Sequence, residues 1–248
     1  MRCSFRRCVI VNQYTLVKNM RIIALLLILA ALLNAQEGGH TCRTLFLNGP
    51  EQAPGKYYLF DGRSSQEVTL PRLSFSPVYK LRPGDIKLWL LASPVGKLEE
   101  IPPGSPEVTV PAANIDFYLL IINDPSNSLM PLRMQVVNAD YDKFRLGEML
   151  WFNLTPKHLA GTVGKSSLKL APNSSALVNE PASKLENYPV EIYFRVPGDV
   201  RTHPLIESQW RHDPRARSIV FVFDEGKRRA PKIRSFSDFR IAEMKKEE

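Results

Sequence analysis

The stretch FRLGEMLWFNLTPKHLAGTVGKSSLKLAPNSSALV, which runs over Phe144–Val178, decides the fold class of this chain. Two sets of side chains alternate along Met149–Leu154, and this period of two is typical of a strand with unlike faces. Glycine and proline separate the apolar segments that follow, and both residues favour turns between strands. We therefore predict a meander of short antiparallel strands, whose later members are Ala160–Val163, Ser167–Leu170 and Ser175–Val178.

The rest of the chain has the same character. The 20 prolines of the whole chain lie mostly between apolar runs, and no long run carries the i, i+3, i+4 apolar pattern of an amphipathic helix. Ile86–Leu91 alternates like a strand, whereas Phe117–Asp124 and Ile219–Glu225 are apolar almost throughout, as inner strands covered on both faces are. The charged C-terminus, Asp238–Glu248, is the one helical candidate of note. The predicted fold class is all-β.

Similar features recur at an offset of about 90 residues, which points to a duplicated unit. An apolar strand that ends before a turn, a strand followed by a proline turn and an apolar run that stops at an acid each occur twice. The matched segments are Leu45–Gly49 with Gln135–Ala139, Lys80–Gly84 with Lys169–Asn173, and Phe117–Asp124 with Ile219–Glu225.

We expect two tandem antiparallel β-sandwich domains of the immunoglobulin-like kind, because two packed sheets bury alternating faces. Residues 36–125 would form the first domain and residues 131–226 the second, with a linker at Pro125–Pro131. A basic, charged tail follows at residues 227–248, and it either touches an anionic partner or is a solvated terminus. One larger sandwich, or a single helix-poor domain, stays open as the alternative.

Residues 1–35 have the order of a secretory signal peptide. Five basic residues and no acidic residue precede Gln36, and an apolar run, Ile22–Leu33, leads through Asn34 to a small residue, Ala35, where signal peptidase would cut. At about twelve residues the run is shorter than the ~20 that span a bilayer as a helix. Cleavage after Ala35 is expected, while a start at Met20, a retained anchor and a buried core helix stay open.

The formal net charge of +8 comes mostly from that leader. Five of the 33 basic residues lie before Gln36, which leaves 28 against 25 acidic residues. So small an excess does not indicate a nucleic-acid partner. We expect a monomer exported to the periplasm or cell envelope of a bacterium, which meets the membrane only transiently through its signal peptide.

Cysteine usage excludes an internal disulfide in the mature chain. Cys3 and Cys8 lie in the leader, and Cys42 alone remains. Its thiol is either a buried small hydrophobe or an exposed group able to pair between chains.

No pattern for metal, cofactor or nucleophilic chemistry stands out. His203 and His212 could join Asp213 at a zinc ion, but they lack the close spacing of usual zinc ligands. The chain has no G-x-S-x-G nucleophile elbow and no glycine-rich phosphate loop. We therefore expect no metal, no cofactor and no catalytic residue. Because a carboxylate pair assembled across strands leaves no mark in a sequence, a hydrolase acting on envelope polysaccharide or ester substrates is the alternative.

Aromatic and basic side chains give the best lead to a binding surface, since tryptophan, tyrosine and arginine dominate interface hot spots. By alternation, Trp89 and Trp151 lie opposite the apolar neighbours on their strands, so each either faces outward or packs against another part. Pro197–Arg217 mixes arginine, histidine and tryptophan between two predicted strands, and loops carried on sheets often bear function. The candidate binding residues are Trp210, Arg211, His212, His203, Trp151 and Trp89.

Phe144–Val178 also resembles a type of uncharacterised secreted or periplasmic β-rich bacterial protein with immunoglobulin-like sandwich domains. The likeness lies in an F-x-x-G-E-x-x-W-x-N-L-T-like strand, a G-x-x-G hairpin and an L-x-P-G/N turn, and it covers the second half of the chain better than the first. The residues that carry it are Phe144, Gly147, Glu148, Trp151, Asn153, Leu154, Thr155, Gly161, Gly164, Leu170 and Pro172. The resemblance implies an envelope or periplasmic setting, and it implies no known activity, ligand or catalytic residue.

The function that we expect from the sequence is that of an exported, non-catalytic envelope protein. It would act as a binding or structural-accessory module for another envelope protein or a glycan.

Overall fold

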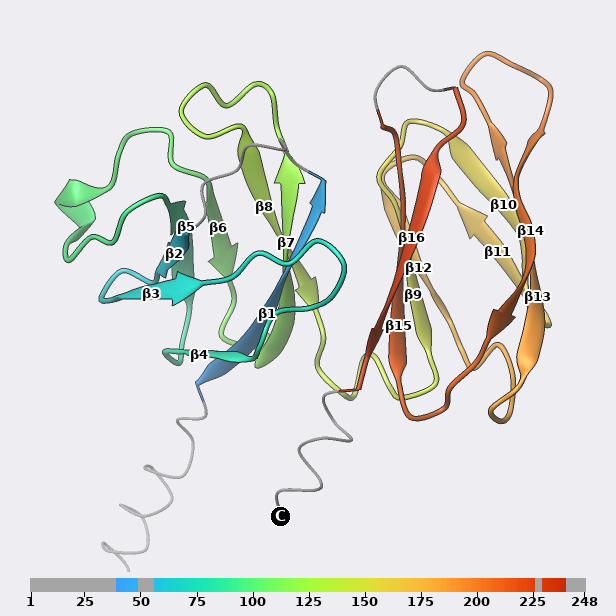
Figure 1. Ribbon diagram of the computed structural model, residues 1–248, viewed down its shortest axis with the longest axis horizontal. Coiled ribbons are helices and arrows are strands. Elements are labelled where there is room, and N and C mark those ends of the chain that lie inside the picture. The colour runs from blue at the N-terminus through green and yellow to red at the C-terminus, as the bar shows by residue number, and fades with distance from the viewer. Residues whose placement is uncertain (1–38, 49–55, 226–228, 240–248) are drawn as a thin grey trace, which may run out of the picture. The chain divides into compact units, whose positions relative to one another are not determined.

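The computed structural model describes residues 39–48, 56–225 and 229–239. Within these ranges the chain forms sixteen β-strands and one short 3-10 helix, η1 (Leu98–Glu100), so the prediction of an all-β fold is confirmed (Figure 1). The first eight strands are β1 (His40–Asn48), β2 (Tyr57–Phe60), β3 (Ser65–Val68), β4 (Tyr79–Leu81), β5 (Ile86–Leu91), β6 (Glu107–Val110), β7 (Asp116–Asn123) and β8 (Leu132–Asn138). The second eight are β9 (Met149–Asn153), β10 (His158–Val163), β11 (Ser166–Leu170), β12 (Ser174–Val178), β13 (Asn187–Arg195), β14 (His203–Arg211), β15 (Arg217–Phe223) and β16 (Lys232–Asp238).

The first eight strands form two four-stranded sheets, in the orders β4-β1-β7-β8 and β3-β2-β5-β6. The second eight repeat both orders, as β12-β9-β15-β16 and β11-β10-β13-β14, so each strand has a counterpart eight strands later. β1 runs parallel to β7, and β9 runs parallel to β15. The other pairs of described strands are antiparallel. The prediction of antiparallel sheets is therefore wrong for two of the four, which are mixed.

Three hydrophobic clusters hold the four sheets together. One lies between the two sheets of the first eight strands and another between the two sheets of the second eight, which is sandwich-like packing. The third joins the β7 sheet to the β15 sheet. On β7, Phe117 and Leu119 belong to the first cluster and Tyr118 and Leu120 to the third, so this strand is covered on both faces as its apolar run predicted. Cys42 is fully buried in the first cluster, which is the first of the two alternatives for its thiol.

A buried ionic cluster lies where the two sets of strands meet. Asp238 on β16 accepts hydrogen bonds from Arg43 on β1 (2.7 Å), Arg217 on β15 (3.0 Å) and the hydroxyl of Tyr118 on β7. The side chains of Arg217 and Asp238 are fully buried, and Arg217 also lies 3.6 Å from the carboxylate of Asp116. Two arginines and two aspartates thus balance their charges in a place where an unpaired charge would be costly.

The strands predicted in Phe144–Val178 are present as β9 to β12, within a few residues of the expected bounds. They do not form a meander, however. β10 and β11 pair as a hairpin, whereas β9 pairs with β12 in the other sheet. The alternation of apolar and polar residues shows which face of a strand is buried. It does not show which other strand forms hydrogen bonds with its edge.

The structure also corrects the alignment of the repeat. Phe117–Asp124 and Ile219–Glu225 match β7 and β15, which are counterparts in the two sets. The other two matched pairs join β1 with β8 and β4 with β11, which are not counterparts. Short apolar strands that end in turns resemble one another wherever they lie in a sheet, so only the long buried strands aligned correctly.

The predicted linker and tail are both corrected in part. Pro125–Pro131 connects β7 to β8, which are antiparallel neighbours in one sheet, so it is not a linker between domains. The chain passes from the first set of strands to the second in residues 139–148. Within the predicted tail, Lys232–Asp238 forms β16 and pairs with β15. The predicted leader, residues 1–35, and most of the candidate C-terminal helix, residues 240–248, lie outside the described residues.

Candidate functional site

The segment Pro197–Arg217, which was predicted as a loop, is mostly a strand. β14 takes up His203–Arg211 and pairs with β13. The prediction was wrong because two prolines, Pro204 and Pro214, and an irregular apolar pattern hide the strand in the sequence.

β14 is the edge strand of its sheet, and its outer edge has no partner among the described strands. The N–H of Gly164 donates to the carbonyl oxygen of Pro189 on β13 (2.8 Å), so the backbone of Pro189 points towards β10 and away from β14. Gln209 lies opposite Pro189, and its own N–H and C=O therefore point to the free edge. By the two-residue period of a strand, those of Glu207 and Arg211 do the same.

A bulge and a proline limit how much of this edge is open. The pairing shifts next to Ile192, which leaves Leu205 as an extra residue in β14. Pro204 lies opposite Tyr193, and it has no N–H to donate. Prolines on edge strands protect sheets against unwanted pairing, so the open part of the edge is residues 205–211.

The two faces of β14 differ in chemistry. Ile206 and Trp210 are partly buried against the hydrophobic cluster of the second eight strands. On the opposite face Glu207 lies directly across from Glu191 of β13, and both side chains are exposed. Because two carboxylates directly opposite each other repel, this face of the strand pair favours a cationic neighbour.

Two of the three candidate tryptophans lie together. Trp210 stacks on Trp151 of β9, with ring centroids 5.6 Å apart and ring planes 6° apart. Trp151 is fully buried, so the prediction that it contributes to a binding surface is wrong. The physical reason is that β9 is covered on both faces. Trp89 is partly exposed on β5, in another sheet, where it donates to Glu107 at 3.0 Å, and the structure does not bring it to β14.

His203 begins β14 within a small charged cluster. Its Nε2 lies 3.4 Å from a carboxylate oxygen of Asp199 and 3.1 Å from Arg229, which itself lies 3.1 Å from the same oxygen. The backbone N–H of Arg201 is the main cause of the low pKa of Asp199, about 2. The cluster therefore ties the loop before β14 to the start of the strand.

His212 follows the other end of β14 and is only 4% exposed. Its ring meets the ring of Tyr188 edge-on at 6.3 Å, and its Nε2 has no hydrogen-bond partner in the described part of the chain. Burial lowers the pKa of His212, although the negative charges of Glu180, Asp213 and Glu186 act in the other direction. Because its side chain is almost fully buried, His212 packs inside the fold and offers little surface to a partner, contrary to its choice as a binding residue. Arg211, the residue before it, is exposed.

The structure does not bring His203 and His212 together. They lie at opposite ends of β14, roughly 30 Å apart at ~3.3 Å per residue. Asp213 is paired with Arg215 at 2.7 Å. Among the described residues, no group of three or more His, Cys, Asp or Glu side chains is arranged to hold a metal ion.

The sequence analysis did not single out Glu207, Gln209 or Glu191. In the sequence they are ordinary polar residues, and only the pairing of β13 with β14 places Glu207 opposite Glu191 and turns the backbone of Gln209 outward. A partial signal existed in Asn187–Arg195, where buried and exposed residues alternate without a break. That pattern marks β13 as a two-faced strand, and it does not identify the strand beside it.

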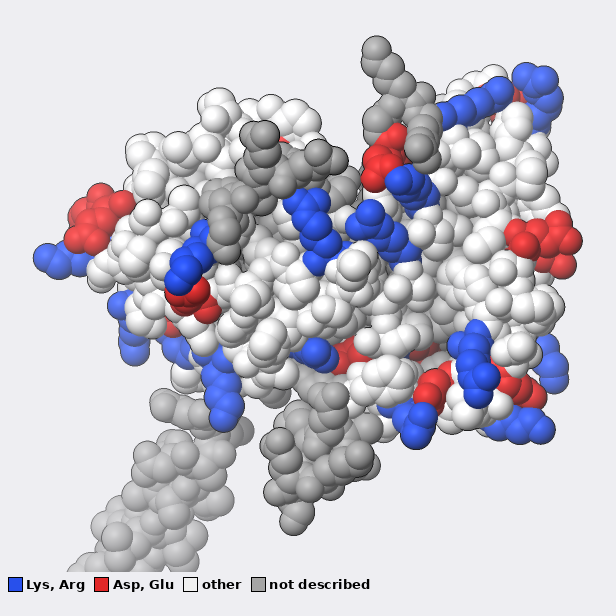
Figure 2. Space-filling model, viewed as in Figure 1, with Lys and Arg blue, Asp and Glu red and all other residues white. Residues whose placement is uncertain are grey.

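On the face drawn in Figure 2, lysine and arginine side chains are interspersed with acidic ones and form no continuous basic stripe. No helix in the described part of the chain is long and apolar enough to cross a membrane. No protein-family model matches this chain, and no curated protein matches it. Its function is therefore inferred from geometry.

Proposed function

We propose that this chain is an exported, non-catalytic binding module of a bacterial cell envelope, which takes up an extended segment of another envelope protein along the free edge of β14. The observation that carries this proposal is the outward orientation of the backbone N–H and C=O groups of Glu207, Gln209 and Arg211 at an edge with no described partner. An extended peptide that adds to such an edge gains main-chain hydrogen bonds, and side-chain pockets on alternate positions supply specificity.

The two faces of β14 define the chemistry of the partner segment. On one face an added strand would extend the apolar surface of Ile206 and Trp210, so alternate residues of the partner should be apolar. On the other face the added strand would lie next to Glu207 and Glu191. The partner residues that alternate with the apolar ones should therefore be lysine or arginine. The partner segment is thus a short strand that alternates apolar and basic residues.

The proposal also includes export through a cleaved leader and an organisation into two tandem domains. The basic, apolar and small-residue order of residues 1–35 supports a cleaved leader. The repeated strand order of β1–β8 and β9–β16, with a hydrophobic cluster inside each set, supports two tandem sandwich domains of immunoglobulin-like architecture. The parallel pair in each set differs from the antiparallel sheets of an immunoglobulin domain, so the likeness is one of architecture and not of strand order.

The experiment is a crosslinking capture from an envelope fraction with three forms of the chain: the natural one, Glu207→Pro and Glu207→Thr. Proline removes an outward N–H that the fold does not use, and proline is tolerated on an edge in that orientation. Threonine keeps the N–H and suits a strand, but it removes the charge. We expect the proline variant to lose the partner, and the threonine variant to keep it with weaker capture.

Crosslinks should map to residues 205–211, and the captured protein should contribute a segment of alternating apolar and basic residues. Equal capture by the natural chain and Glu207→Pro, or crosslinks that map to another sheet, would contradict strand addition at β14. Trp210→Ala is a poor probe here, because Trp210 also packs on the buried Trp151 and its loss would disturb the core.

The exposed pair Glu191 and Glu207 is a specific observation in favour of the alternative, a hydrolase of envelope polysaccharide or esters. Directly opposed residues on neighbouring strands have Cβ atoms about 4.5–5.5 Å apart, close to the spacing that a carboxylate pair needs. Against it, both side chains lie on an exposed sheet face, whereas a general acid needs an environment that raises its pKa. Turnover of a glycan or ester substrate that Glu191→Gln and Glu207→Gln each abolish would support the hydrolase.

A further inference from the structure

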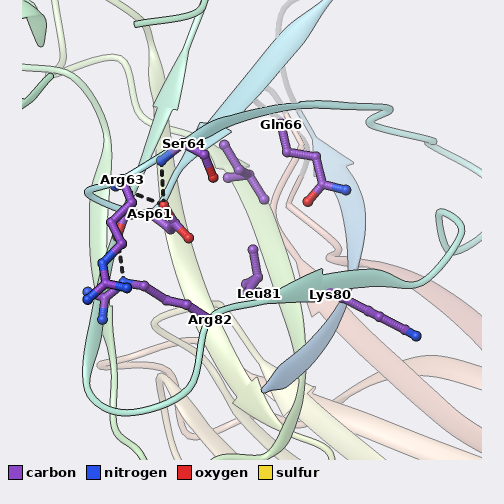
Figure 3. Close-up of a pocket in the computed structure, with 8 residues that line it drawn as sticks. Asp61, Arg63, Ser64, Gln66, Lys80, Leu81 and Arg82 are labelled. Carbon is purple, nitrogen blue, oxygen red and sulfur yellow. Dashed lines mark hydrogen bonds between the residues drawn. The ribbon is translucent and has the colours of Figure 1, made fainter. Parts of the chain in front are cut away.

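A pocket of about 270 Å³ opens in the first set of strands, far along the chain from β14. It lies beside β3 and β4, which are edge strands of two different sheets. The lining residues are Leu59, Asp61, Arg63, Ser64, Gln66, Lys80, Leu81 and Arg82. Figure 3 shows that the labelled side chains come from the turn after β2, from β3 and from the region of β4.

Two leucines lie behind the pocket, and polar side chains surround it. Leu59 and Leu81 are both buried, at 1% and 8% exposure. Around them stand three cationic side chains and one acidic side chain, Asp61. The leucines therefore offer a ligand little apolar surface, and the lining side chains together carry an excess of two positive charges.

Asp61 is committed to the fold and forms no direct ion pair with the three cationic side chains of the pocket. Its side chain is 7% exposed, and its Oδ1 accepts the backbone N–H groups of Arg63 and Ser64, both at 2.9 Å. These two bonds shape the turn between β2 and β3. The same turn places the exposed Arg63 side chain at the edge of the pocket.

Arg82 is held in place by the same turn. Its Nε donates to the backbone carbonyl oxygen of Asp61 at 3.0 Å, which leaves the two terminal nitrogens of the guanidinium for another acceptor. Within the described part of the chain, neither Arg63, Arg82 nor Lys80 forms an ion pair. In Figure 3 the guanidinium groups of Arg63 and Arg82 lie on the same side of the turn, and Lys80 points the other way.

We propose that this pocket binds a sugar unit that carries a carboxylate or phosphate group. Arginine binds both anions through paired N–H donors, and two arginines on one side of a pocket provide such donors for a single anion. The side chains of Ser64 and Gln66 line the same pocket and can bond the hydroxyls of a sugar. Because the volume lies just below the range of ordinary ligand sites, about 300–1,000 Å³, the pocket accommodates one sugar unit and not a longer stretch of polymer.

Binding at this pocket goes beyond the proposed function, and it does not depend on strand addition at β14. If both hold, the chain contacts a protein with the second set of strands and an anionic envelope glycan with the first. Each site has its own variants, so the failure of one proposal leaves the other intact.

The experiment titrates the purified chain with glucuronate, glucose 6-phosphate, inorganic phosphate and glucose, and follows binding by calorimetry. We expect at least one of the two anionic sugars to bind, and glucose to show no binding. Preference for glucuronate would indicate an acidic polysaccharide, and preference for glucose 6-phosphate would indicate a phosphorylated glycan; both outcomes support the proposal. Absence of binding by both anionic sugars would overturn it, and so would inorganic phosphate that binds as tightly as glucose 6-phosphate.

Three variants localise the site. Arg63→Gln and Arg82→Gln should each weaken the binding of the anionic sugar at least roughly tenfold, since each removes a hydrogen bond to a charged group. Arg145→Gln removes the same charge from an exposed position in the second half of the chain, and it should leave the affinity unchanged. Arg63→Gln is the decisive variant, because the Arg63 side chain takes no part in the turn, whereas Arg82 does. Wild-type affinity in Arg63→Gln, or an equal loss in Arg145→Gln, would overturn the assignment of the pocket.

Discussion

At the scale of single residues, Asn153 shows how one residue of the Phe144–Val178 motif serves the fold. Its side chain is fully buried, and its amide donates to the carbonyl oxygens of Lys157 (2.7 Å) and Ala171 (2.8 Å). Its Oδ1 accepts the backbone N–H (3.1 Å) and the hydroxyl (2.8 Å) of Thr155. The N-L-T part of the motif therefore shapes the turn after β9, because a buried amide must satisfy its donors and acceptors locally.

His212 leads to a prediction about pH. Burial lowers its pKa in the folded chain below the ordinary value of 6.5, so the unfolded chain takes up a proton more readily than the folded one. His212 therefore makes its full contribution to the free energy of unfolding above about pH 6.5. This contribution should be lost as the pH drops towards and through the pKa of His212 in the folded chain. Urea denaturation at steps from pH 7 to 5 measures this loss.

The matched variants are His212→Gln and His158→Gln, since the His158 side chain is exposed on β10. His212→Gln should be less stable at pH 7 but should show a flatter dependence on pH. His158→Gln should keep the natural slope. The carboxylates of Asp199 and Asp213, with pKa values of about 2, titrate well below this window and do not obscure it. The same slope in His212→Gln as in the natural chain would refute the assignment.

At the scale of elements, β14 combines a structural inner face with an open outer edge. Trp210 covers the fully buried Trp151 on β9, so the strand is anchored by an aromatic stack. Its backbone groups at Glu207 and Gln209, in contrast, point away from the sheet. A substitution on this strand consequently affects stability or binding according to which direction it faces.

The tryptophan stack supports a prediction about stability. Trp151→Ala should lower the free energy of unfolding by about 3–5 kcal/mol, because it opens a cavity in the core. Trp210→Ala should cost less, since that side chain is only partly buried. Trp89→Ala, on a partly exposed ring in another sheet, serves as the control and should cost least. Urea denaturation measures all three, and a smaller loss for Trp151→Ala than for Trp89→Ala would show that the stack is not part of the core.

At the scale of the whole molecule, the two sets of strands share buried chemistry and should unfold together. The third hydrophobic cluster includes residues of β1, β7, β9 and β15, and the ionic cluster around Asp238 draws on both sets. Removing one partner of a buried charge cluster leaves another charge uncompensated, which is expensive.

Asp238→Asn therefore tests the coupling between the two sets. We expect it to reduce the free energy of unfolding by about 3–5 kcal/mol, because the buried guanidinium of Arg217 loses its main counter-charge. Calorimetry of the natural chain should show one cooperative transition, and Asp238→Asn should lower its temperature or split it in two. Ser237→Ala, at an exposed neighbouring position on β16, should leave the transition unchanged. Two separate transitions in the natural chain would mean that the shared clusters do not couple the halves.

By itself, the sequence determined the fold class, the position of most strands and the faces that the longest strands bury. Those properties follow from local features, such as the alternation along Ile86–Leu91 and the continuous apolar run of Phe117–Asp124, and local features can be read without a partner. Strand pairing depends on groups far apart in the chain, and every strand offers the same backbone donors and acceptors to any neighbour.

Tertiary structure alone therefore decided which strand has a free edge, that His203 and His212 lie at opposite ends of β14, and that Trp151 is covered. It also brought Arg63 and Arg82 to one pocket across 18 intervening residues. The candidate sites could not be predicted from the sequence, because they consist of backbone edges and side chains that remain accessible after the strands pair and pack. Which groups remain accessible depends on the pairing of every strand.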